Sequence, residues 1–137
     1  MAGRVEGKVA FVTGAARGQG RSHVLKLAEE GADIIAIDIC KNVDHCQLEL
    51  ASPGDLLETK ERVEALGRRI IAEEADVRDF DAMKSVVDRG VAEFGRLDII
   101  LANAGIGNGG QTIEMLEEPV WQAMIDINLT GVWKTVK

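Results

Sequence analysis

Short apolar runs alternate with stretches of helical periodicity along the chain. The runs predict four β-strands, of which the second is continuously apolar, as expected for a strand covered on both faces. The predicted strands span residues 8–13, 33–38, 69–76 and 97–105, the last running into a glycine loop. The other stretches place apolar residues three and four positions apart, which is typical of amphipathic helices. The predicted helices span residues 20–32, 53–66, 79–95 and 118–137.

The ends of the second predicted helix carry local signals. Ser52 can act as its N-cap, Pro53 suits the first helical position, and Asp55 can complete a capping box. A glycine terminates this helix, and the same signal ends the first and third helices, at Gly67, Gly31 and Gly95. Four residues are expected to form the buried face of the second helix: Leu56, Leu57, Val63 and Leu66.

This alternation predicts a single α/β domain over residues 1–137. Strands joined by helices form a parallel sheet with helices on both faces and right-handed crossovers. We expect a Rossmann-type doubly wound sheet with strand order 3-2-1-4, truncated after the helix that follows the fourth strand. Such sheets bind ligands beyond the carboxyl ends of their strands, so the segments after the four strands are expected to meet in one crevice.

A glycine-rich stretch follows the first strand and precedes the first helix. Gly14, Gly18 and Gly20 allow the backbone to approach a ligand closely. The helix start beyond them offers unpaired amides and the positive end of the helix dipole. A diphosphate suits this site, which also contains Arg17 and Gln19. The alternative is a tight strand-to-helix turn that binds no ligand.

Two other phosphate-binding patterns fit this stretch less well. The pattern G-x-G-x-x-G fails because His23 occupies the position of the third glycine. A P-loop would need glycine in place of Ala15 and lysine in place of Arg21, and arginine does not reproduce the compact charge of that lysine. A nucleoside triphosphatase is therefore disfavoured.

An acidic residue ends the second strand. Asp38, followed by Ile39, stands 18 residues beyond Gly20, where a carboxylate can accept both hydroxyls of an adenosine ribose. Its charge would repel a 2′-phosphate, which favours NAD over NADP, although Arg17 could attract that phosphate. The alternative for Asp38 is a turn-forming surface carboxylate.

The ends of the third and fourth strands supply further candidates. Asp76 can accept from an adenine amino group while the amide of Val77 donates to the ring. Asn103, Ala104 and Gly105 form a small-residue turn that lets the main chain come close to a ribose. Asn103 can also tie neighbouring strand ends together. Each of these short sequences can equally be a plain turn.

Composition and charge narrow the class of protein. The chain is 46% hydrophobic and 28% charged, with a net charge of −7 and scattered acidic residues. This acidity argues against a nucleic-acid binder or a protein that adheres to anionic membranes. Cys40 and Cys46 lack a neighbouring Cys/His set, which indicates reduced, structural thiols and no metal site. Because we find no apolar leader and no membrane-length run, we expect a cytoplasmic protein.

Together these motifs resemble the short-chain dehydrogenase/reductase family over essentially the whole chain. The matching residues are Thr13 to Gly20, Asp38, Asp76-Val77 and Asn103-Ala104-Gly105. Ala102 departs from the family pattern, which usually has asparagine there. A finer resemblance, carried by residues 3–40 and the extended connection at 40–52, is to carveol-dehydrogenase-like, mycofactocin-associated members.

The resemblance implies hydride transfer between NAD(H) and a small-molecule secondary alcohol or its ketone. In the mycofactocin-associated branch it implies that NAD is held unusually tightly. Asn128 matches the family's active-site asparagine. The family's other catalytic residues are a serine and a Tyr-x3-Lys motif, which lie beyond the part of the family pattern that this chain covers. The chain contains no tyrosine.

Two hypotheses are therefore open. The chain is either the cofactor-binding half of a dehydrogenase, without turnover of its own, or a non-catalytic dinucleotide-binding module or redox-sensing subunit. The second hypothesis would need protection for the unpaired edge of the fourth strand and for the last helix, which is too apolar to stay exposed. We therefore expect a homo-oligomer, formed through that edge or helix if the chain persists alone. The apolar residues of this helix are Val120, Trp121, Met124, Ile127, Val132 and Trp133.

Overall fold

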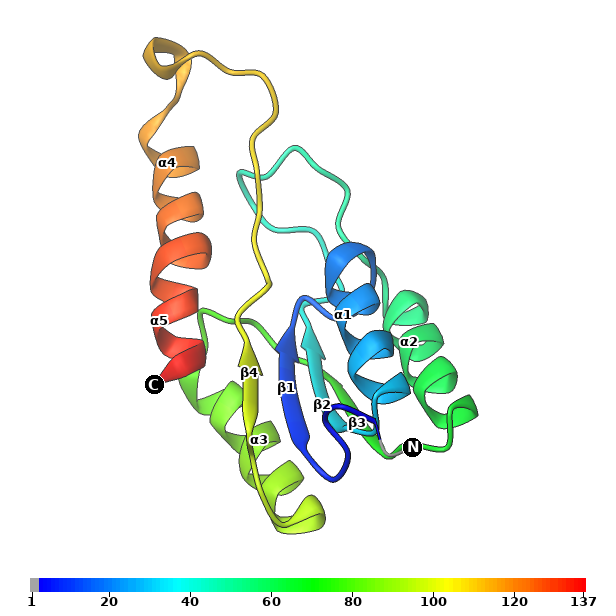
Figure 1. Ribbon diagram of the computed structural model, residues 1–137. Helices are drawn as coiled ribbons and strands as arrows, with labels where there is room; N and C mark the ends of the chain where they lie inside the picture. The colour runs from blue at the N-terminus through cyan, green and yellow to red at the C-terminus, as the bar shows by residue number, and fades with distance from the viewer. Residues whose placement is uncertain (1–2) are drawn as a thin grey trace.

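A four-stranded parallel sheet runs through the centre of the computed structural model, which describes residues 3–137 (Figure 1). The strand order is β3-β2-β1-β4 and each neighbouring pair is parallel. The strands are β1 (Val9–Thr13), β2 (Asp33–Asp38), β3 (Ile70–Glu74) and β4 (Ile99–Leu101). The predicted doubly wound sheet with order 3-2-1-4 is confirmed. The first two residues of the predicted domain lie outside the described residues.

Helices cover both faces of the sheet. On one face lie α1 (Gly18–Glu29) and α2 (Pro53–Ala65), and on the other lies α3 (Phe80–Phe94) together with the last helix (Figure 1). The last helix consists of α4 (Glu118–Ile125), the π-helical segment η2 (Asp126–Thr130) and α5 (Gly131–Val136). A short 3₁₀ turn, η1 (Ile113–Met115), precedes it. Among residues 3–137, none of the helices is both long and apolar enough to cross a membrane.

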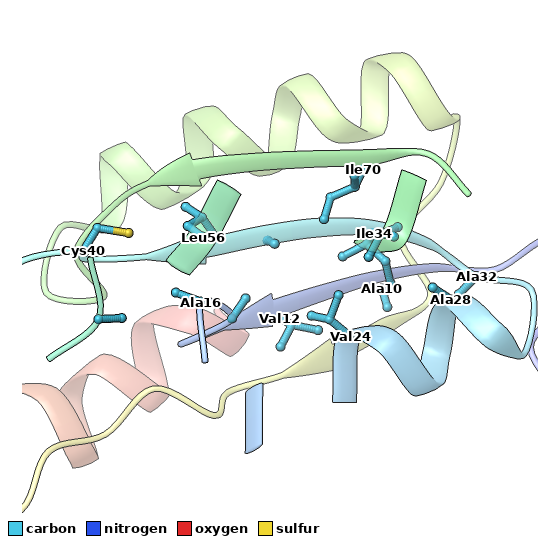
Figure 2. Close-up of a cluster of buried hydrophobic side chains, with 14 residues drawn as sticks. Ala10, Val12, Ala16, Val24, Ala28, Ala32, Ile34, Cys40, Leu56 and Ile70 are labelled. Carbon is cyan, nitrogen blue, oxygen red and sulfur yellow. The ribbon is translucent and has the colours of Figure 1, made fainter. Parts of the chain in front are cut away.

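The hydrophobic core is split into two layers by the central strands. Alternate residues of β1 point to opposite faces, so Ala10 and Val12 pack toward α1 and α2 while Phe11 packs toward α3. Figure 2 shows the first layer, in which Val24 of α1 and Leu56 of α2 meet the sheet. Every residue of β1 and β2 is buried, which explains why the apolar residues within each strand are consecutive rather than alternating.

The predicted caps of α2 are present. The Ser52 side chain accepts from the Asp55 amide at 3.2 Å, and the Asp55 carboxylate accepts from the Ser52 amide at 2.8 Å, which completes the capping box. The three terminating glycines adopt the positive φ that ends a helix. Their φ values are +100° for Gly31, +76° for Gly67 and +87° for Gly95.

Two parts of the local prediction are wrong. β4 is only three residues long, because the chain leaves the sheet before Asn103 to form the loop described below. On α2, Leu57 and Leu66 are 54% and 44% exposed, although both were expected to be buried. The buried residues of α2 are Leu56, Thr59 and Val63, so the buried face is narrower than predicted and includes one polar residue.

The last helix leaves a broad apolar surface exposed. Trp121 is 49% exposed and Trp133 is 56% exposed, whereas Ile127 is buried against the sheet. β4 pairs with β1 at the end of the sheet, and Ile100 on that strand is 38% exposed. The predicted association through this edge or helix stays a prediction.

Candidate functional site

A pocket of about 240 Å³ opens at the carboxyl edge of the sheet, where the segments after all four strands meet. All twelve residues that were predicted to bind a cofactor line this pocket. They are Gly14, Arg17, Gly18, Gln19, Gly20, Asp38, Ile39, Asp76, Val77, Asn103, Ala104 and Gly105. The thirteenth candidate, Asn128, hydrogen-bonds to Ile106, which also lines the pocket.

The glycine turn after β1 needs glycine for different reasons at each position. Gly14 has φ +65°, and a Cβ there would lie 2.9 Å from both Ala104 Cα and Asn103 Nδ2. A Cβ on Gly20 would lie 1.8 Å from the Gly14 carbonyl oxygen, so α1 could not pack against the turn. Gly18 also has a positive φ, +59°, but its Cβ would enter open space at the pocket wall. The residues that begin α1 therefore lie at the pocket wall, where helix-start amides can serve a ligand.

Asp38 is held at the pocket wall by backbone amides. It is 8% exposed, and its Oδ2 accepts from the Ala16 amide at 3.0 Å while its Oδ1 accepts from the Cys40 amide at 3.1 Å. Each carboxylate oxygen keeps a lone pair for another donor. Burial and the charge of Asp38 raise the pKa of the Cys40 thiol to about 12, so Cys40 remains an unreactive thiol beside the site.

Asp76 is oriented by its neighbour Arg78. The Arg78 amide donates to Oδ1 at 2.9 Å, and the guanidinium donates to Oδ2 through Nη2 at 2.6 Å. Burial would raise the pKa of Asp76, but the hydrogen bonds from Arg78 outweigh it and hold this pKa below its ordinary value. Asp76 is therefore ionised and fixed in one orientation at neutral pH.

Asn103 joins the ends of β1 and β4. Its side-chain Nδ2 donates to the carbonyls of Thr13 and Gly14 at 3.1 and 3.3 Å. The amides of Asn103 and Ala104 both donate to Thr13 Oγ1 at 3.0 Å. The predicted role of Asn103 in tying neighbouring strand ends is confirmed.

Asn128 lies in the π-helical segment of the last helix. Its Oδ1 accepts from the Ile106 amide at 2.8 Å, and its Nδ2 donates to the Ile106 carbonyl at 2.7 Å. This pair of bonds fixes the backbone just after the Asn103–Gly105 turn. Pi-helical turns often occur at functional sites, and here the wider turn carries the asparagine that reaches across to the pocket loop.

The comparison with known protein families agrees with this geometry. The model of the family described as short chain dehydrogenase matches residues 8–137. The chain belongs to the short-chain dehydrogenase family. It spans about half the length of the curated relatives that it matches.

Several relatives within this family are close in sequence and structure. The chain is 52% identical to (-)-trans-carveol dehydrogenase of Rhodococcus erythropolis, over 98% of this chain and 48% of that protein. It is 60% identical, with a TM-score of 0.94, to the crystal structure of carveol dehydrogenase from Mycobacterium avium in complex with NAD, over 98% of this chain and 48% of that one. A short-chain dehydrogenase from Mycobacterium paratuberculosis bound to NAD has the same TM-score at 52% identity, over 98% and 49% of the two chains.

Part of the pocket of this short-chain dehydrogenase was missed from the sequence. Residues 40–52, here called the strap, were interpreted only as a connection, yet Val43, Leu50 and Ala51 line the pocket. The Leu50 amide donates to Asn42 Oδ1 at 2.9 Å and closes the neck of the strap. Isolated apolar residues in an otherwise polar connection were the available signal.

Two contacts fasten the strap over the pocket. The Arg17 guanidinium donates to the Glu49 carbonyl, which links the strap to the glycine turn. Cys46 Sγ lies 3.7 Å from the Gly107 carbonyl oxygen, which links it to the loop after β4. Figure 1 shows the strap and that loop rising from the same end of the sheet. Arg17, predicted as a possible phosphate ligand, therefore lines the pocket and also contacts the backbone of the strap.

Proposed function

We propose that this chain is the NAD-binding half of a short-chain dehydrogenase that interconverts a secondary alcohol and a ketone. The observation that carries the proposal is the convergence of twelve residues, from the ends of four strands, on one pocket. Gly18 lies at the wall of this pocket, where it has a positive φ and an added Cβ would meet no protein atom within 4 Å.

The residues of the pocket fit a nicotinamide dinucleotide. The amides at the start of α1, from Gly18 to Gly20, suit its diphosphate, and the Asp38 carboxylate suits the hydroxyls of its adenosine ribose. Asp76 and Val77 would take the adenine, and Asn103 to Gly105 the second ribose. When bound, the nicotinamide accepts or donates the hydride.

Two observations favour NAD over NADP. A buried carboxylate at Asp38 would repel a 2′-phosphate, and Arg17 directs its guanidinium to the Glu49 carbonyl. The two similar crystal structures described above carry NAD in their names. The strap closes over the pocket through its contacts with Arg17 and Gly107, which is consistent with tight retention of NAD.

The substrate and the catalytic residues are inferred from the family. The relatives named as carveol dehydrogenases support a small-molecule alcohol as the substrate of the whole enzyme. Asn128 would be the catalytic-site residue that this chain supplies, through its bonds to the Ile106 backbone. Because the chain contains no tyrosine, we propose that the acid–base half of the domain is absent from residues 1–137 and that this chain alone gives no turnover. We further propose a cytoplasmic homo-oligomer.

Calorimetric titration with NAD⁺ and NADP⁺ tests the cofactor proposal. We expect saturable binding of NAD⁺ and at least about tenfold weaker binding of NADP⁺, because the charge of Asp38 opposes the extra phosphate. Equal affinity for the two, or no binding of either, would contradict it. Spectrophotometric assay with a panel of secondary alcohols tests the absence of turnover; measurable reduction of NAD⁺ by this chain would reject that part.

A non-catalytic dinucleotide-binding module is the second candidate function, favoured by the absence of tyrosine. This module would have the same cofactor site as the half-domain, so the two candidates are compared by their oligomeric state. A stable, monodisperse monomer of this chain in light scattering would count against the half-domain, because its exposed Trp121 and Trp133 should cause association.

A further inference from the structure

Thr59 is a fully buried polar residue on α2, directly behind the glycine turn. Its side chain is 0% exposed, and its Oγ1 lies 3.0 Å from the carbonyl oxygens of both Ala15 and Ala16. The hydroxyl also lies 3.3 Å from the Asp55 carbonyl oxygen. A hydroxyl has a single proton, so Thr59 donates it to one of the two nearer carbonyls of the turn or shares it between them.

Arg21 meets Thr59 at the same place. Its side chain is 16% exposed, and Nε donates at 3.0 Å to both the Ala16 carbonyl and Thr59 Oγ1. Nη2 donates to the Asp55 carbonyl at 2.7 Å, and Nη1 pairs with Glu58 at 3.0 Å. The guanidinium therefore binds the rear of the turn and α2, away from the pocket. This position is the one where a P-loop would place a phosphate-binding lysine.

These contacts determine which way two peptide groups of the turn face. In a trans peptide, a carbonyl and the following amide point in opposite directions. The Ala15 carbonyl points to Thr59, and the following amide, of Ala16, accordingly points to Asp38 Oδ2 at 3.0 Å. By the same rule, the Ala16 carbonyl, held by Arg21 and Thr59, turns the Arg17 amide away from α2. Arg17 lines the pocket.

We propose that Arg21 and Thr59 are positioning residues that preorganise the glycine turn for the adenosine diphosphate half of the cofactor. They hold the carbonyls of Ala15 and Ala16 behind the turn, so that one amide fixes the Asp38 carboxylate and the next is presented to the ligand. The inference rests on the proposed function, because it assigns these residues a role toward NAD. Rigid orientation of binding groups before the ligand arrives increases affinity.

Two substitutions at Thr59 separate positioning from packing. Thr59→Val keeps the volume and removes the hydroxyl, and we expect the Kd for NAD⁺ to rise about tenfold, with the same factor for ADP-ribose. Thr59→Ser keeps the hydroxyl and removes a methyl group, so we expect a lower unfolding temperature with a Kd within about twofold of the wild type. Glu61→Gln, on the exposed face of the same helix, is the matched control and should change neither quantity.

The outcomes distinguish this inference from the proposed function. If wild-type protein fails to bind NAD⁺ in the titration, both are overturned. If the wild type binds NAD⁺ and Thr59→Val binds it equally well, only the positioning role is overturned. The same holds if the affinity of the two variants falls with their unfolding temperature and does not depend on whether the hydroxyl is present. If Thr59→Val does not fold, Arg21→Met replaces it in the test. We expect Arg21→Met to bind NAD⁺ and ADP-ribose more weakly than the wild type, and unchanged binding would overturn the positioning role.

Discussion

Strand β2 begins and ends with a buried carboxylate, and the two are held in opposite ways. Asp33 is 4% exposed at the start of the strand, and Asp38 is 8% exposed at its end. Asp33 accepts from Arg69 through the amide at 3.0 Å and through Nε at 2.9 Å, and Arg68 Nη2 lies 3.1 Å from its Oδ1. Asp38 accepts the two backbone amides described above.

The difference separates a structural acid from a binding acid. The guanidinium groups around Asp33 neutralise its charge and join β2 to the segment that begins β3, so its contribution is to stability. Backbone amides orient Asp38 but add no compensating charge. Its negative charge therefore remains available to the pocket, at the edge of a parallel sheet where ligands bind.

Removing the charge of Asp38 should have the largest effect on binding. In Asp38→Asn, the new NH₂ group must face either the Ala16 or the Cys40 amide, donor against donor, and the ribose hydroxyls lose a charged acceptor. We expect the Kd for NAD⁺ to rise about a hundredfold and the preference over NADP⁺ to disappear. Calorimetry with both cofactors measures this change. Retained preference for NAD⁺ would remove Asp38 from the site.

The equivalent substitution at the other end of the strand should act on stability alone. Asp33→Asn leaves Arg68 and Arg69 without their buried partner, and we expect the free energy of unfolding to fall by about 2 kcal/mol. The Kd for NAD⁺ should stay within about twofold of the wild type. Urea denaturation gives the first quantity and calorimetry the second. A large loss of affinity here, without loss of stability, would reverse the assignment of the two acids.

The pH dependence of stability should also identify Asp33. Burial would raise the pKa of Asp33, but its hydrogen bonds from Arg69 outweigh burial and lower this pKa below the ordinary value of 3.8. The folded state then binds fewer protons than the unfolded state. The stabilisation of the folded state by ionised Asp33 is therefore complete at pH values well above 3.8, and it is lost as the pH falls through the pKa of Asp33 in the folded state. Urea denaturation of wild type and Asp33→Asn between about pH 2 and pH 7 should show their difference shrinking on acidification. A constant difference would contradict the ion-pair explanation.

Local signals made most of the fold predictable. The Ser52 cap and the terminating glycines are recognised from neighbouring residues, and the order of strands and helices then leaves few parallel topologies. The cofactor candidates were predictable for the same reason. Each lies at the end of a strand or in the segment that follows it, and parallel strands bring such positions to one edge.

Contacts between distant segments could not be predicted in this way. Arg21 and Thr59 are 38 positions apart in the sequence. From the sequence, Arg21 stands where a P-loop would have lysine, and Thr59 is one polar residue within a predicted helix. The same applies to Leu57, whose exposure depends on how closely α2 lies on the sheet. The pocket-lining residues of the strap depend on its contacts with Arg17 and Gly107. Periodicity says which face of an element is apolar, but not which other element covers it.

A matched pair of glycines gives the smallest and most specific test. Gly18 and Gly67 have φ values of +59° and +76°, and at both positions an added Cβ would have no atom within 4 Å among the described residues. Replacing either by alanine should therefore cost about 1 kcal/mol of stability, because an L-residue is strained in the left-handed region. Gly67 terminates α2 away from the pocket, whereas Gly18 lies at the pocket wall. We expect denaturation to show equal losses of stability in the two variants, and calorimetry to show several-fold weaker binding of NAD⁺ in Gly18→Ala alone. This result would show that the ligand needs the space beside Gly18. Equal affinities in the two variants would mean that Gly18 serves the turn only.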